Sequence, residues 1–423
     1  MVGIGGLAGF VDTLLPLGAM TMQLTIRLSL WFLLIFAARA GAARDSYLVS
    51  DQPSGEIWRL QDLNGDGDAL DTGEKLLWAD ALLSVVELEV HGSDVYAIEE
   101  GMVDGANQAI RFTDLNGDGD ALDIGEQSIW ADGFDDPRGI AVDDQGVWYV
   151  TENEDDRVWA LTDINNDGDA LDVGERTLFA DQIDGATTVA RHRSGILVTG
   201  ANQNEVFRLN DYNGDGDALD VGESSVITPF VNSPVGVLDD DSGGFYFSSF
   251  SNDAVYHAVD RNGDGDMLDE IETLTYADAV FGGINGPWGM TNHADGGFLL
   301  ASFISGQIMW VRDANGDGDA LDQGDVSLFA DGFLFPVDVV AVPECSPDAD
   351  GDGDVDGRDF LIFQRERPEK IPLWSANYGA TLPLSTLSEP AAWTTAATSS
   401  AVPEPTTIIL ALAGLCLANR RRL

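Results

Sequence analysis

Residues 139–180 read GIAVDDQGVWYVTENEDDRVWALTDINNDGDALDVGERTLFA, and this stretch decides the fold. Short runs rich in β-branched and aromatic residues occur at 139–143, 147–151, 158–161 and 176–180. They are separated by a tight turn, a polar loop and an Asp-rich loop, at 144–146, 152–156 and 163–175. Four short strands joined by turns predict one antiparallel four-stranded sheet, and no part of the stretch has a sustained helical period.

The Asp-rich loop of this stretch belongs to a string that occurs six times. The string D-x-N-G-D-G-D-A-L-D-x-G-E, or a close variant, starts at Asp62, Asp114, Asp163, Asp211, Asp260 and Asp313. The starts are 52, 49, 48, 49 and 53 residues apart. A period near 50 with four strands per repeat is typical of propeller blades. We therefore expect an all-β fold, a six-bladed β-propeller.

The two ends of the repeat array predict how the ring closes. Only the runs 46–49 and 56–60 precede the first Asp-rich loop, so the first repeat lacks its first strand. After the sixth repeat, residues 335–342 form an unmatched strand. The simplest solution makes this strand the innermost one of blade 1, which leaves no open sheet edge. Over residues 46–343 the pattern resembles six-bladed propellers of the NHL and gluconolactonase-like kind, a resemblance that rests on the blade pattern and not on a catalytic motif.

Each Asp-rich loop resembles an EF-hand-type calcium loop with one extra residue. In such loops, oxygen ligands occupy positions 1, 3, 5, 7 (through the backbone), 9 and 12, with Gly at 6. With Asp62 as position 1, the match is complete through Gly67 at position 6. The usual apolar residue then falls at position 9 (Leu70) and the closing acid at position 13 (Glu74). We infer one residue inserted near position 8, in a loop that joins two strands.

The chemistry of these loops favours Ca²⁺, because carboxylates and amides are hard oxygen ligands and neither His nor Cys is present. The alternative is a set of solvated Asp- and Gly-rich turns, which six copies with the same acid spacing disfavour. The predicted ligands are Asp62, Asn64, Asp66, Asp68, Asp71, Glu74; Asp114, Asn116, Asp118, Asp120, Asp123, Glu126; Asp163, Asn165, Asp167, Asp169, Asp172, Glu175; Asp211, Asn213, Asp215, Asp217, Asp220, Glu223; Asp260, Asn262, Asp264, Asp266, Asp269, Glu272; and Asp313, Asn315, Asp317, Asp319, Asp322, Asp325.

A seventh loop follows the repeats and has the EF-hand spacing without the insertion. Its acids are Asp348, Asp350, Asp352, Asp354, Asp356 and Asp359, and a short helix is expected from Phe360. This segment resembles half of a dockerin type I module. Dockerins pair two such units to bind cohesin, so a small calcium-bound spacer is an equally good interpretation. Together the loops predict about seven Ca²⁺ per chain.

Composition narrows the classes of partner. The chain of 423 residues has 73 acidic against 21 basic side chains, a net charge of −52. Nucleic-acid binding is excluded, because it needs a basic surface. The two Cys, Cys345 and Cys416, lie in unlike contexts and do not form a disulfide framework, and the four His are scattered singly.

Both ends of the sequence carry targeting patterns. Arg27, the apolar run 28–38 and the small residues 40–43 are typical of a secretory signal, with Met20 or Met22 as a possible true start. Residues 402–423 combine Pro403-Glu404-Pro405, a short apolar run and three arginines. That tail resembles the PEP-CTERM sorting signal, which implies export and cleavage by an exosortase-type enzyme, with transient membrane association, in a Gram-negative bacterium. The expected organisation is a signal peptide at 1–43, the propeller at 44–343, the dockerin-like loop and helix at 344–378, a flexible stalk at 379–401 and the sorting signal at 402–423.

Two functions from different classes remain open. In a four-stranded blade the Asp-rich loops join the two outer strands, so the opposite face of the ring is free for ligands. Its expected residues are Phe134, Pro137, Pro234, Trp288, Phe333 and Phe335, with Asp51, Glu99, Glu100, Glu152, Asn153, Asn202, Ser249 and Ser302. We favour a non-catalytic, calcium-binding module displayed at the cell surface or in the extracellular matrix, where it binds a protein or glycan. The alternative is a metal-dependent hydrolase or lyase of the gluconolactonase-like kind, with a central ion held by residues such as Glu152 and Asn202.

Overall fold

The computed structural model describes residues 46–101, 107–342 and 357–366. The predicted signal peptide, most of the dockerin-like loop, the stalk and the sorting signal lie outside these residues. Of the segment after the repeats, the structure describes one helix, α3 (Gly357–Glu366), which begins three residues before the expected start at Phe360. None of the described helices is both long enough and apolar enough to cross a lipid bilayer.

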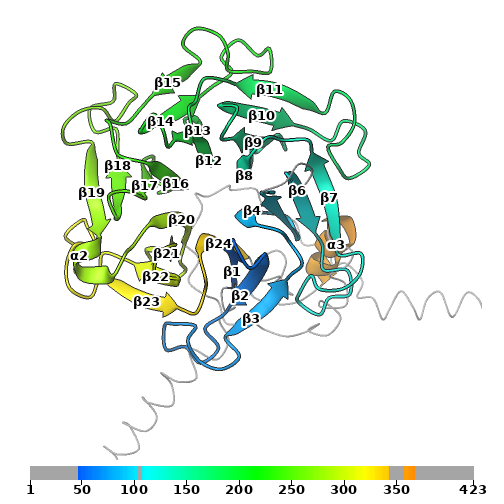
Figure 1. The fold of residues 1–423 in the computed structure, drawn as a ribbon, viewed down its shortest axis with the longest axis horizontal. Helices are drawn as coiled ribbons and strands as arrows, with labels where there is room; N and C mark the ends of the chain where they lie inside the picture. Colours follow the sequence, from blue (N-terminus) through cyan, green and yellow to red (C-terminus); the bar gives the residue numbers. More distant parts are fainter. Residues whose placement is uncertain (1–45, 102–106, 343–356, 367–423) are drawn as a thin grey trace, which may run out of the picture.

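Six four-stranded antiparallel sheets are arranged around a central axis, as Figure 1 shows. The strands of each blade are given from the innermost to the outermost. Blade 1 comprises β24 (Pro336–Val342), β1 (Ser46–Asp51), β2 (Glu56–Leu60) and β3 (Lys75–Ala79). Blade 2 comprises β4 (Val85–His91), β5 (Asp94–Glu99), β6 (Gln108–Phe112) and β7 (Gln127–Asp132). Blades 3 and 4 comprise β8 (Pro137–Val142), β9 (Trp148–Glu152), β10 (Arg157–Leu161), β11 (Arg176–Ala180), and β12 (Ala186–His192), β13 (Gly195–Gly200), β14 (Glu205–Leu209), β15 (Ser224–Val226). Blades 5 and 6 comprise β16 (Pro234–Asp239), β17 (Phe245–Ser249), β18 (Ala254–Ala258), β19 (Thr273–Asp278), and β20 (Pro287–Asn292), β21 (Phe298–Ser302), β22 (Gln307–Val311), β23 (Val326–Ala330).

The six-bladed propeller and the way in which it closes are confirmed. The last strand, β24, pairs antiparallel with the first, β1, with Ser46 opposite Val342 and Val49 opposite Val339. Both ends of the repeat array therefore contribute to blade 1, and this strand pairing closes the ring. A short helix, α2 (Ala279–Gly282), interrupts the connection from blade 5 to blade 6, and Asp278 caps it by accepting the Val280 N–H.

The hydrophobic core lies between the blades. Each of six clusters of buried apolar side chains combines residues of two adjacent sheets. Between blades 2 and 3, for example, the rings of Trp130 and Trp148 lie 4.9 Å apart, and the ring of Tyr96 lies 4.1 Å from Trp148. This packing follows from the alternation of side chains along each strand, which turns one face of every sheet towards the next. The loops at the rim and the strands at the axis are the parts left to carry function.

Candidate functional site

The first residue of every Asp-rich loop organises the loop backbone. Asp62 accepts the Gly65 N–H at 2.5 Å with Oδ1 and the Gly67 N–H at 2.9 Å with Oδ2. The other five loops repeat both bonds, from the N–H groups of positions 4 and 6 to the carboxylate of position 1. In the sixth loop, hydrogen bonds led by the Gly318 N–H lower the pKa of Asp313. Position 1 thus fixes the turn of each loop through two backbone N–H groups.

The side chains of positions 3, 5 and 10 converge in all six loops. In the first loop, Asn64 Nδ2 donates to Asp66 Oδ2 at 3.0 Å and to Asp71 Oδ2 at 2.6 Å. The same two bonds recur in the other loops at 2.5–3.1 Å. The residue that joins this group is at position 10, one residue later than in an EF-hand-type loop. Two exposed carboxylates are held together there with one amide between them.

The closing acid at position 13 lies inside the loop and is buried. Glu74, which is 2% exposed, accepts the Leu63 N–H at 2.9 Å with Oε1 and the Asp71 N–H at 3.0 Å with Oε2. Glu126, Glu175, Glu223, Glu272 and Asp325 are also buried and accept the N–H of position 2. A buried carboxylate is tolerated because backbone donors replace its hydration. Position 13 therefore joins the two halves of each loop.

Position 8 attaches each loop to the preceding blade. Its N–H donates to a carbonyl of that blade at 2.7–2.8 Å in all six loops, as from Ala69 to Phe329 and from Ala121 to Trp78. Its side chain is buried among the apolar residues between the blades, and the six residues are Ala69, Ala121, Ala170, Ala218, Met267 and Ala320. Position 8, near which the sequence indicates an inserted residue, thus connects neighbouring blades.

The side chain of position 7 does not join the group formed by positions 3, 5 and 10, but accepts a backbone N–H instead. Asp68 Oδ1 accepts the N–H of Leu70 at 3.1 Å, and each of the other loops repeats this bond between positions 7 and 9. Burial raises the pKa of Asp68, and the charges of the neighbouring acids raise it further. Among the described residues, one group of three acids has carboxylate oxygens within 4.8 Å of one another: Asp264, Asp266 and Glu272 in the fifth loop.

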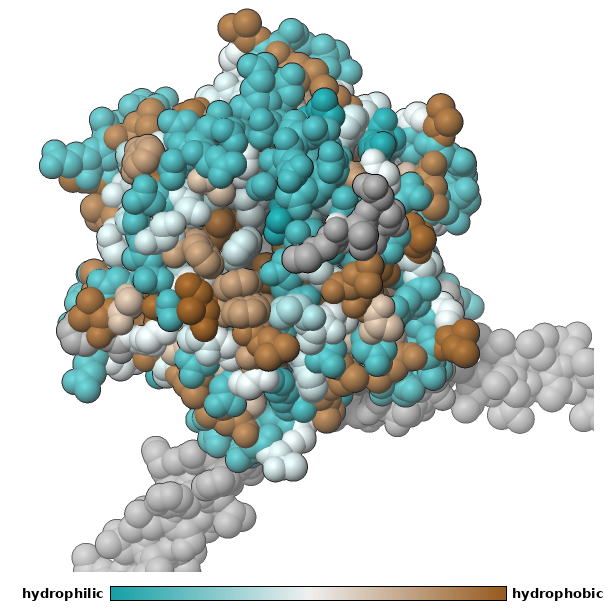
Figure 2. Space-filling view, viewed as in Figure 1, coloured by the Kyte–Doolittle hydropathy of each residue, from teal (hydrophilic) through white to brown (hydrophobic). Residues whose placement is uncertain are grey.

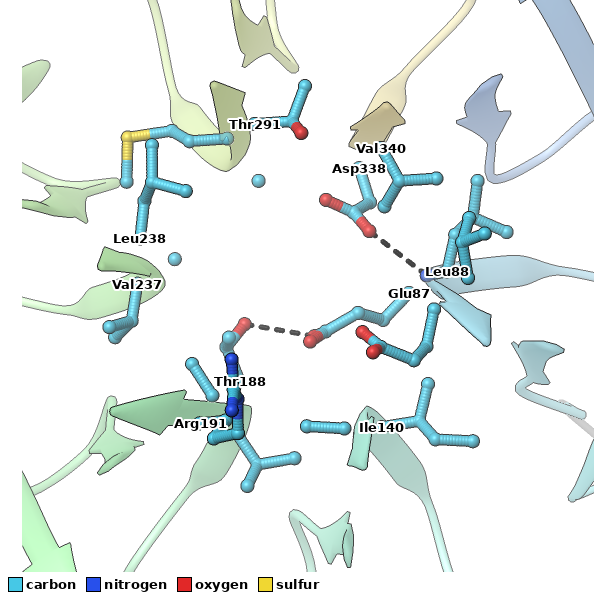
Figure 3. Close-up of a pocket in the computed structure, with 18 of the residues that line it drawn as sticks. Glu87, Leu88, Ile140, Thr188, Arg191, Val237, Leu238, Thr291, Asp338 and Val340 are labelled. Carbon is cyan, nitrogen blue, oxygen red and sulfur yellow. Dashed lines mark hydrogen bonds between the residues drawn. The ribbon is translucent and has the colours of Figure 1, made fainter. Parts of the chain in front are cut away.

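A second candidate site lies on the axis and was not predicted from the sequence. A cavity of about 310 Å³ is lined by the innermost strands, and its acids are Glu87 and Glu89 from β4 and Asp338 from β24. Figure 3 shows Glu87 accepting a hydrogen bond from Thr188 Oγ1, at 3.0 Å, and Asp338 accepting one from the Leu88 N–H, also at 3.0 Å. Both carboxylates are shielded from bulk solvent, with Glu87 9% and Asp338 6% exposed.

The axial acids are electrostatically strained in their charged forms. Burial raises the pKa of Glu87 well above its usual value, and the negative charge of Asp338 adds to the effect. The same two causes raise the pKa of Glu89 to about 8, against a smaller opposing effect of Arg191. Burial raises the pKa of Asp338 to about 7. Raised pKa values of this kind suit a general acid or base that works near neutral pH.

Three of the acids expected on the free face are used to hold the fold together. Asp51 accepts the N–H groups of Leu334 and Phe335 at 2.9 and 2.8 Å. Glu99 accepts the Leu83 N–H and Glu152 accepts the Asp135 N–H, in each case from the connection that enters the same blade. All three residues are less than 5% exposed. The acid at the end of the second strand therefore fixes the loop leading into its blade.

The pair suggested for a central ion is not brought together by any contact in the described structure. Besides Glu152, this pair comprised Asn202, whose Nδ2 donates to Asp184 Oδ1 at 2.9 Å. Ser249 and Ser302 are buried, and Ser302 Oγ donates to the Asn285 carbonyl at 3.1 Å. Asn153 lies against Thr187, and Glu100 forms an ion pair of 3.0 Å with Arg138. These polar residues stabilise contacts within and between blades.

The aromatic residues of the same face include a continuous row of four rings. Phe250 lies 5.6 Å from Trp288, Trp288 lies 5.6 Å from Phe303, and Phe303 stacks on Phe335 at 4.8 Å between ring centroids. The exposed fraction of Phe335 is 42%, and its neighbour Leu334 is 61% exposed. Phe134 and Phe333 are instead buried, while Pro137 and Pro234 begin β8 and β16.

The rim of the ring is polar, with hydrophobic residues at its tips. Figure 2 shows hydrophilic (teal) surface over much of the rim and single hydrophobic (brown) residues that project from it. Position 11 of three loops carries such a residue, and Ile124, Val173 and Val221 are fully exposed. Isolated apolar residues of this kind need no partner.

The innermost strands do contain a signal for the axial acids. The third residue is Gly in β8, β16 and β20, but Glu87 in β4, Thr188 in β12 and Asp338 in β24. A Cβ at Gly289 would lie 2.0 Å from Asp338 Oδ1, so the axis has little room for side chains at this level. The axial acids could have been predicted from the sequence, because Glu87 and Asp338 occupy a strand position at which half of the blades have Gly.

Comparison with known proteins finds solved propellers of similar fold but does not assign the chain to a family. A model described as a domain of unknown function (DUF7133) matches residues 149–226, and no curated protein matches. A solved nidogen/laminin complex shares 14% identity over 71% of this chain and 100% of that chain, with a TM-score of 0.50. A streptogramin B lyase (14% identity, 71% and 88% covered, TM-score 0.43) and an auxiliary nutrient binding protein from Bacteroides thetaiotaomicron (13%, 71% and 72%, 0.46) are also similar. At such identities the likeness concerns the propeller fold alone.

Proposed function

We propose that this protein is an exported, calcium-binding propeller that acts as a non-catalytic module and binds an extracellular protein or glycan. The observation that carries the proposal is the repeated loop geometry. In six loops the acids of positions 5 and 10 meet around the Asn of position 3, while position 13 closes the loop from inside. Solvated turns have no need to hold like charges together six times over.

The chemistry of this group fits Ca²⁺. In the first loop the amide of Asn64 places its Nδ2 between two carboxylates, where positive charge is favoured. A half-turn of that amide would present Oδ1 instead and give three oxygens around one point, at the cost of the hydrogen bond that Oδ1 accepts from the Asp66 N–H at 2.8 Å. Ca²⁺ takes six to eight oxygens, from carboxylates, amides, backbone carbonyls and water. Positions 3, 5 and 10 would hold the ion, with position 13 as the closing carboxylate.

The aromatic row supports the binding role. Phe250, Trp288, Phe303 and Phe335 lie on the face opposite the Asp-rich loops, and they come from blades 5, 6 and the connection to blade 1. Aromatic side chains offer large, rigid contact areas at low entropic cost, both to proteins and to sugar rings. Loss of binding in Phe335→Ala, with an unchanged melting temperature, is the expected signature of this surface.

The axial acids favour the second candidate, a metal-dependent hydrolase or lyase of the gluconolactonase-like kind. Glu87, Glu89 and Asp338 share a cavity, and their raised pKa values suit proton transfer. The nucleophile and the groups that would stabilise a transition state are not assembled there by any contact among the described residues. Binding therefore remains the better-supported function.

One experiment separates the two functions. The mature, calcium-loaded protein is tested in parallel for binding to extracellular polysaccharides and proteins and for turnover of lactones. Binding without turnover supports the proposal. Lactone turnover that disappears in Glu87→Gln but persists in the matched variant Glu100→Gln would establish the enzyme instead.

Export and surface display rest on the sequence signals at the two ends. We propose cleavage of the tail by an exosortase-type enzyme, and replacement of Pro403-Glu404-Pro405 by alanines should leave a longer, membrane-retained species. The intact mass of the exported wild-type protein is the check, and Arg420 still attached would show that the tail is no sorting signal.

A further inference from the structure

The loop of blade 5 differs from the other five at one backbone position. Position 12 is Gly73, Gly125, Gly174, Gly222 or Gly324 in those loops, with φ between 97° and 104°. In blade 5 the residue is Ile271, whose φ is not positive. A β-branched residue is strongly disfavoured in the left-handed region, so the chain must take another conformation there.

The change at position 12 alters the closing carboxylate. In the other five loops the N–H of position 10 donates to the second oxygen of residue 13, at 3.0–3.2 Å. In blade 5 the first oxygen of Glu272 still accepts the N–H groups of Arg261 and Asn262. Its second oxygen, Oε2, is buried and has no hydrogen-bond partner. Glu272 as a whole is 1% exposed.

The same loop contains the group of three acids whose carboxylate oxygens lie within 4.8 Å of one another. Glu272 supplies one of them, Asp264 (position 5) and Asp266 (position 7) the others. A buried carboxylate oxygen without a donor, beside two further carboxylates, is unfavourable unless a cation satisfies it. The two observations are independent, since one concerns a missing donor and the other the approach of three acids.

Charge alone does not distinguish this loop from its neighbour. The loop of blade 4 has five acids and no basic residue between Asp211 and Glu223. The loop of blade 5 has six acids, including Glu270, and one base, Arg261. Both loops therefore have the same net charge, and any difference in cation binding between them arises from geometry.

We propose that the loop of blade 5 is the primary Ca²⁺ site, which fills before the other loops and binds more tightly. This inference rests on the proposed calcium-binding function. In five loops a cation must compete with the position 10 N–H for the closing carboxylate. In blade 5 Oε2 of Glu272 has no hydrogen-bond partner, and the Glu272 carboxylate lies within 4.8 Å of those of Asp264 and Asp266, so less reorganisation opposes binding. Relief of an unsatisfied buried oxygen adds to the affinity.

The test is a calorimetric Ca²⁺ titration of the full mature chain after exhaustive chelation. The wild type should show a first phase of one ion per chain, at least about tenfold tighter than the rest, which corresponds to about 1.4 kcal/mol. Glu272→Gln should lose this first phase and keep the second. The matched variant Glu223→Gln should keep the first phase and lose one ion from the second. Ile271→Gly should merge the two phases without changing the total number of ions.

Melting in chelator gives a second readout that needs no metal. In Glu272→Gln the new NH₂ can replace an oxygen that has no donor, and it removes one negative charge from the group with Asp264 and Asp266, so the melting temperature should stay level or rise. In Glu223→Gln the NH₂ replaces the acceptor of the Asp220 N–H, so the melting temperature should fall. Opposite signs from the same substitution in two loops of equal charge would not follow from a general loss of folding.

The outcomes that overturn the inference differ from those that overturn the proposed function. A single phase for all loops, or loss of the tight ion in Glu223→Gln, would refute a primary site in blade 5 while leaving calcium binding intact. No heat and no retained Ca²⁺ in any variant would refute the calcium-binding function itself.

Discussion

Glu175 illustrates how one residue can both hold the loop backbone and take part in the proposed metal site. Its Oε1 accepts the Ile164 N–H at 2.9 Å and its Oε2 accepts the Asp172 N–H at 3.0 Å. Each carboxylate oxygen has a second lone pair, so an ion that binds Glu175 must share the carboxylate with these N–H donors. Asp169, at position 7 of the same loop, accepts only the Leu171 N–H with its side chain.

These contacts predict unequal effects of two substitutions. Glu175→Gln should weaken Ca²⁺ binding by one site markedly and destabilise the metal-free protein by about 1–3 kcal/mol, because an N–H loses its acceptor. Asp169→Asn should change Ca²⁺ binding and stability less. Asn keeps an acceptor for the Leu171 N–H, and position 7 is expected to bind the ion through its backbone carbonyl. Calcium titration and urea unfolding of both variants provide the measurement. Equal effects, or the reverse order, would reject the inserted-residue model of the loop.

The axial acids predict an unusual dependence of stability on pH. The pKa of Asp338 is raised from 3.8 to about 7 and that of Glu89 from 4.5 to about 8. A group whose pKa is higher in the folded state contributes stability that is complete below the unfolded pKa and is lost as pH rises through the folded value. In chelator, stability should therefore fall as the pH rises from about 4 to about 8.

A variant isolates this effect from the loops. Glu89→Gln should raise the free energy of unfolding at pH 8.5 by something on the order of 1–3 kcal/mol and leave it nearly unchanged at pH 5. The exposed Glu270→Gln serves as the control. Equal stability of wild type and Glu89→Gln at both pH values would mean that Glu89 is not strained in its charged form.

At the scale of the loop, the buried residue at position 8 has more effect on the fold than its exposed neighbour. Ala121 is fully buried, and its N–H reaches the Trp78 carbonyl of blade 1 at 2.8 Å. Leu122, the next residue, is 40% exposed. Each loop therefore attaches its blade to the preceding one through position 8, which is Ala in five loops and Met267 in blade 5.

This arrangement predicts opposite tolerances at adjacent positions. Ala121→Leu should destabilise the protein by about 1–3 kcal/mol, because added methylenes must fit between two packed blades. Leu122→Ala should change stability by no more than about 0.5 kcal/mol. Thermal unfolding of the two variants in saturating Ca²⁺ decides the matter, and a harmless Ala121→Leu would show that the loop does not hold the blades together.

The features of the fold that repeat from blade to blade could be predicted from the sequence. Blade number, the four strands of each blade and the closure by the last strand follow from a period near 50 and from an unmatched strand at 335–342. The sequence indicates an insertion near position 8, but the contact of this position with another blade depends on how sheets stack, which no local pattern encodes. The role of Asp51, Glu99 and Glu152 was missed for the same reason, since an acid that accepts loop N–H groups resembles a free surface acid in sequence.

At the scale of the whole molecule, stability depends on six interfaces between blades. Each interface combines a hydrophobic cluster with a loop that reaches across from the next blade. If each loop holds Ca²⁺, then the ions stabilise every interface of the ring at once. The chain's net charge of −52 makes such neutralisation important, because self-repulsion opposes a compact state.

Chelation should therefore lower the melting temperature strongly. One site saturated at a hundred times its dissociation constant contributes about 2.7 kcal/mol. Emptying several sites should lower the melting temperature by more than about 10 °C. Added Ca²⁺ should restore it, and Mg²⁺ should do so poorly, because Mg²⁺ demands a smaller octahedral site. An unchanged melt in chelator would indicate that the loops are solvated turns.

The central claim, that every Asp-rich loop is a calcium site, is tested most directly by metal content. The exported protein is dialysed against metal-free buffer containing a low, fixed concentration of Ca²⁺, and bound Ca²⁺ is counted by elemental analysis against protein concentration. Six blade loops and the loop from Asp348 to Asp359 predict about seven ions per chain. A count of one or two would contradict the account.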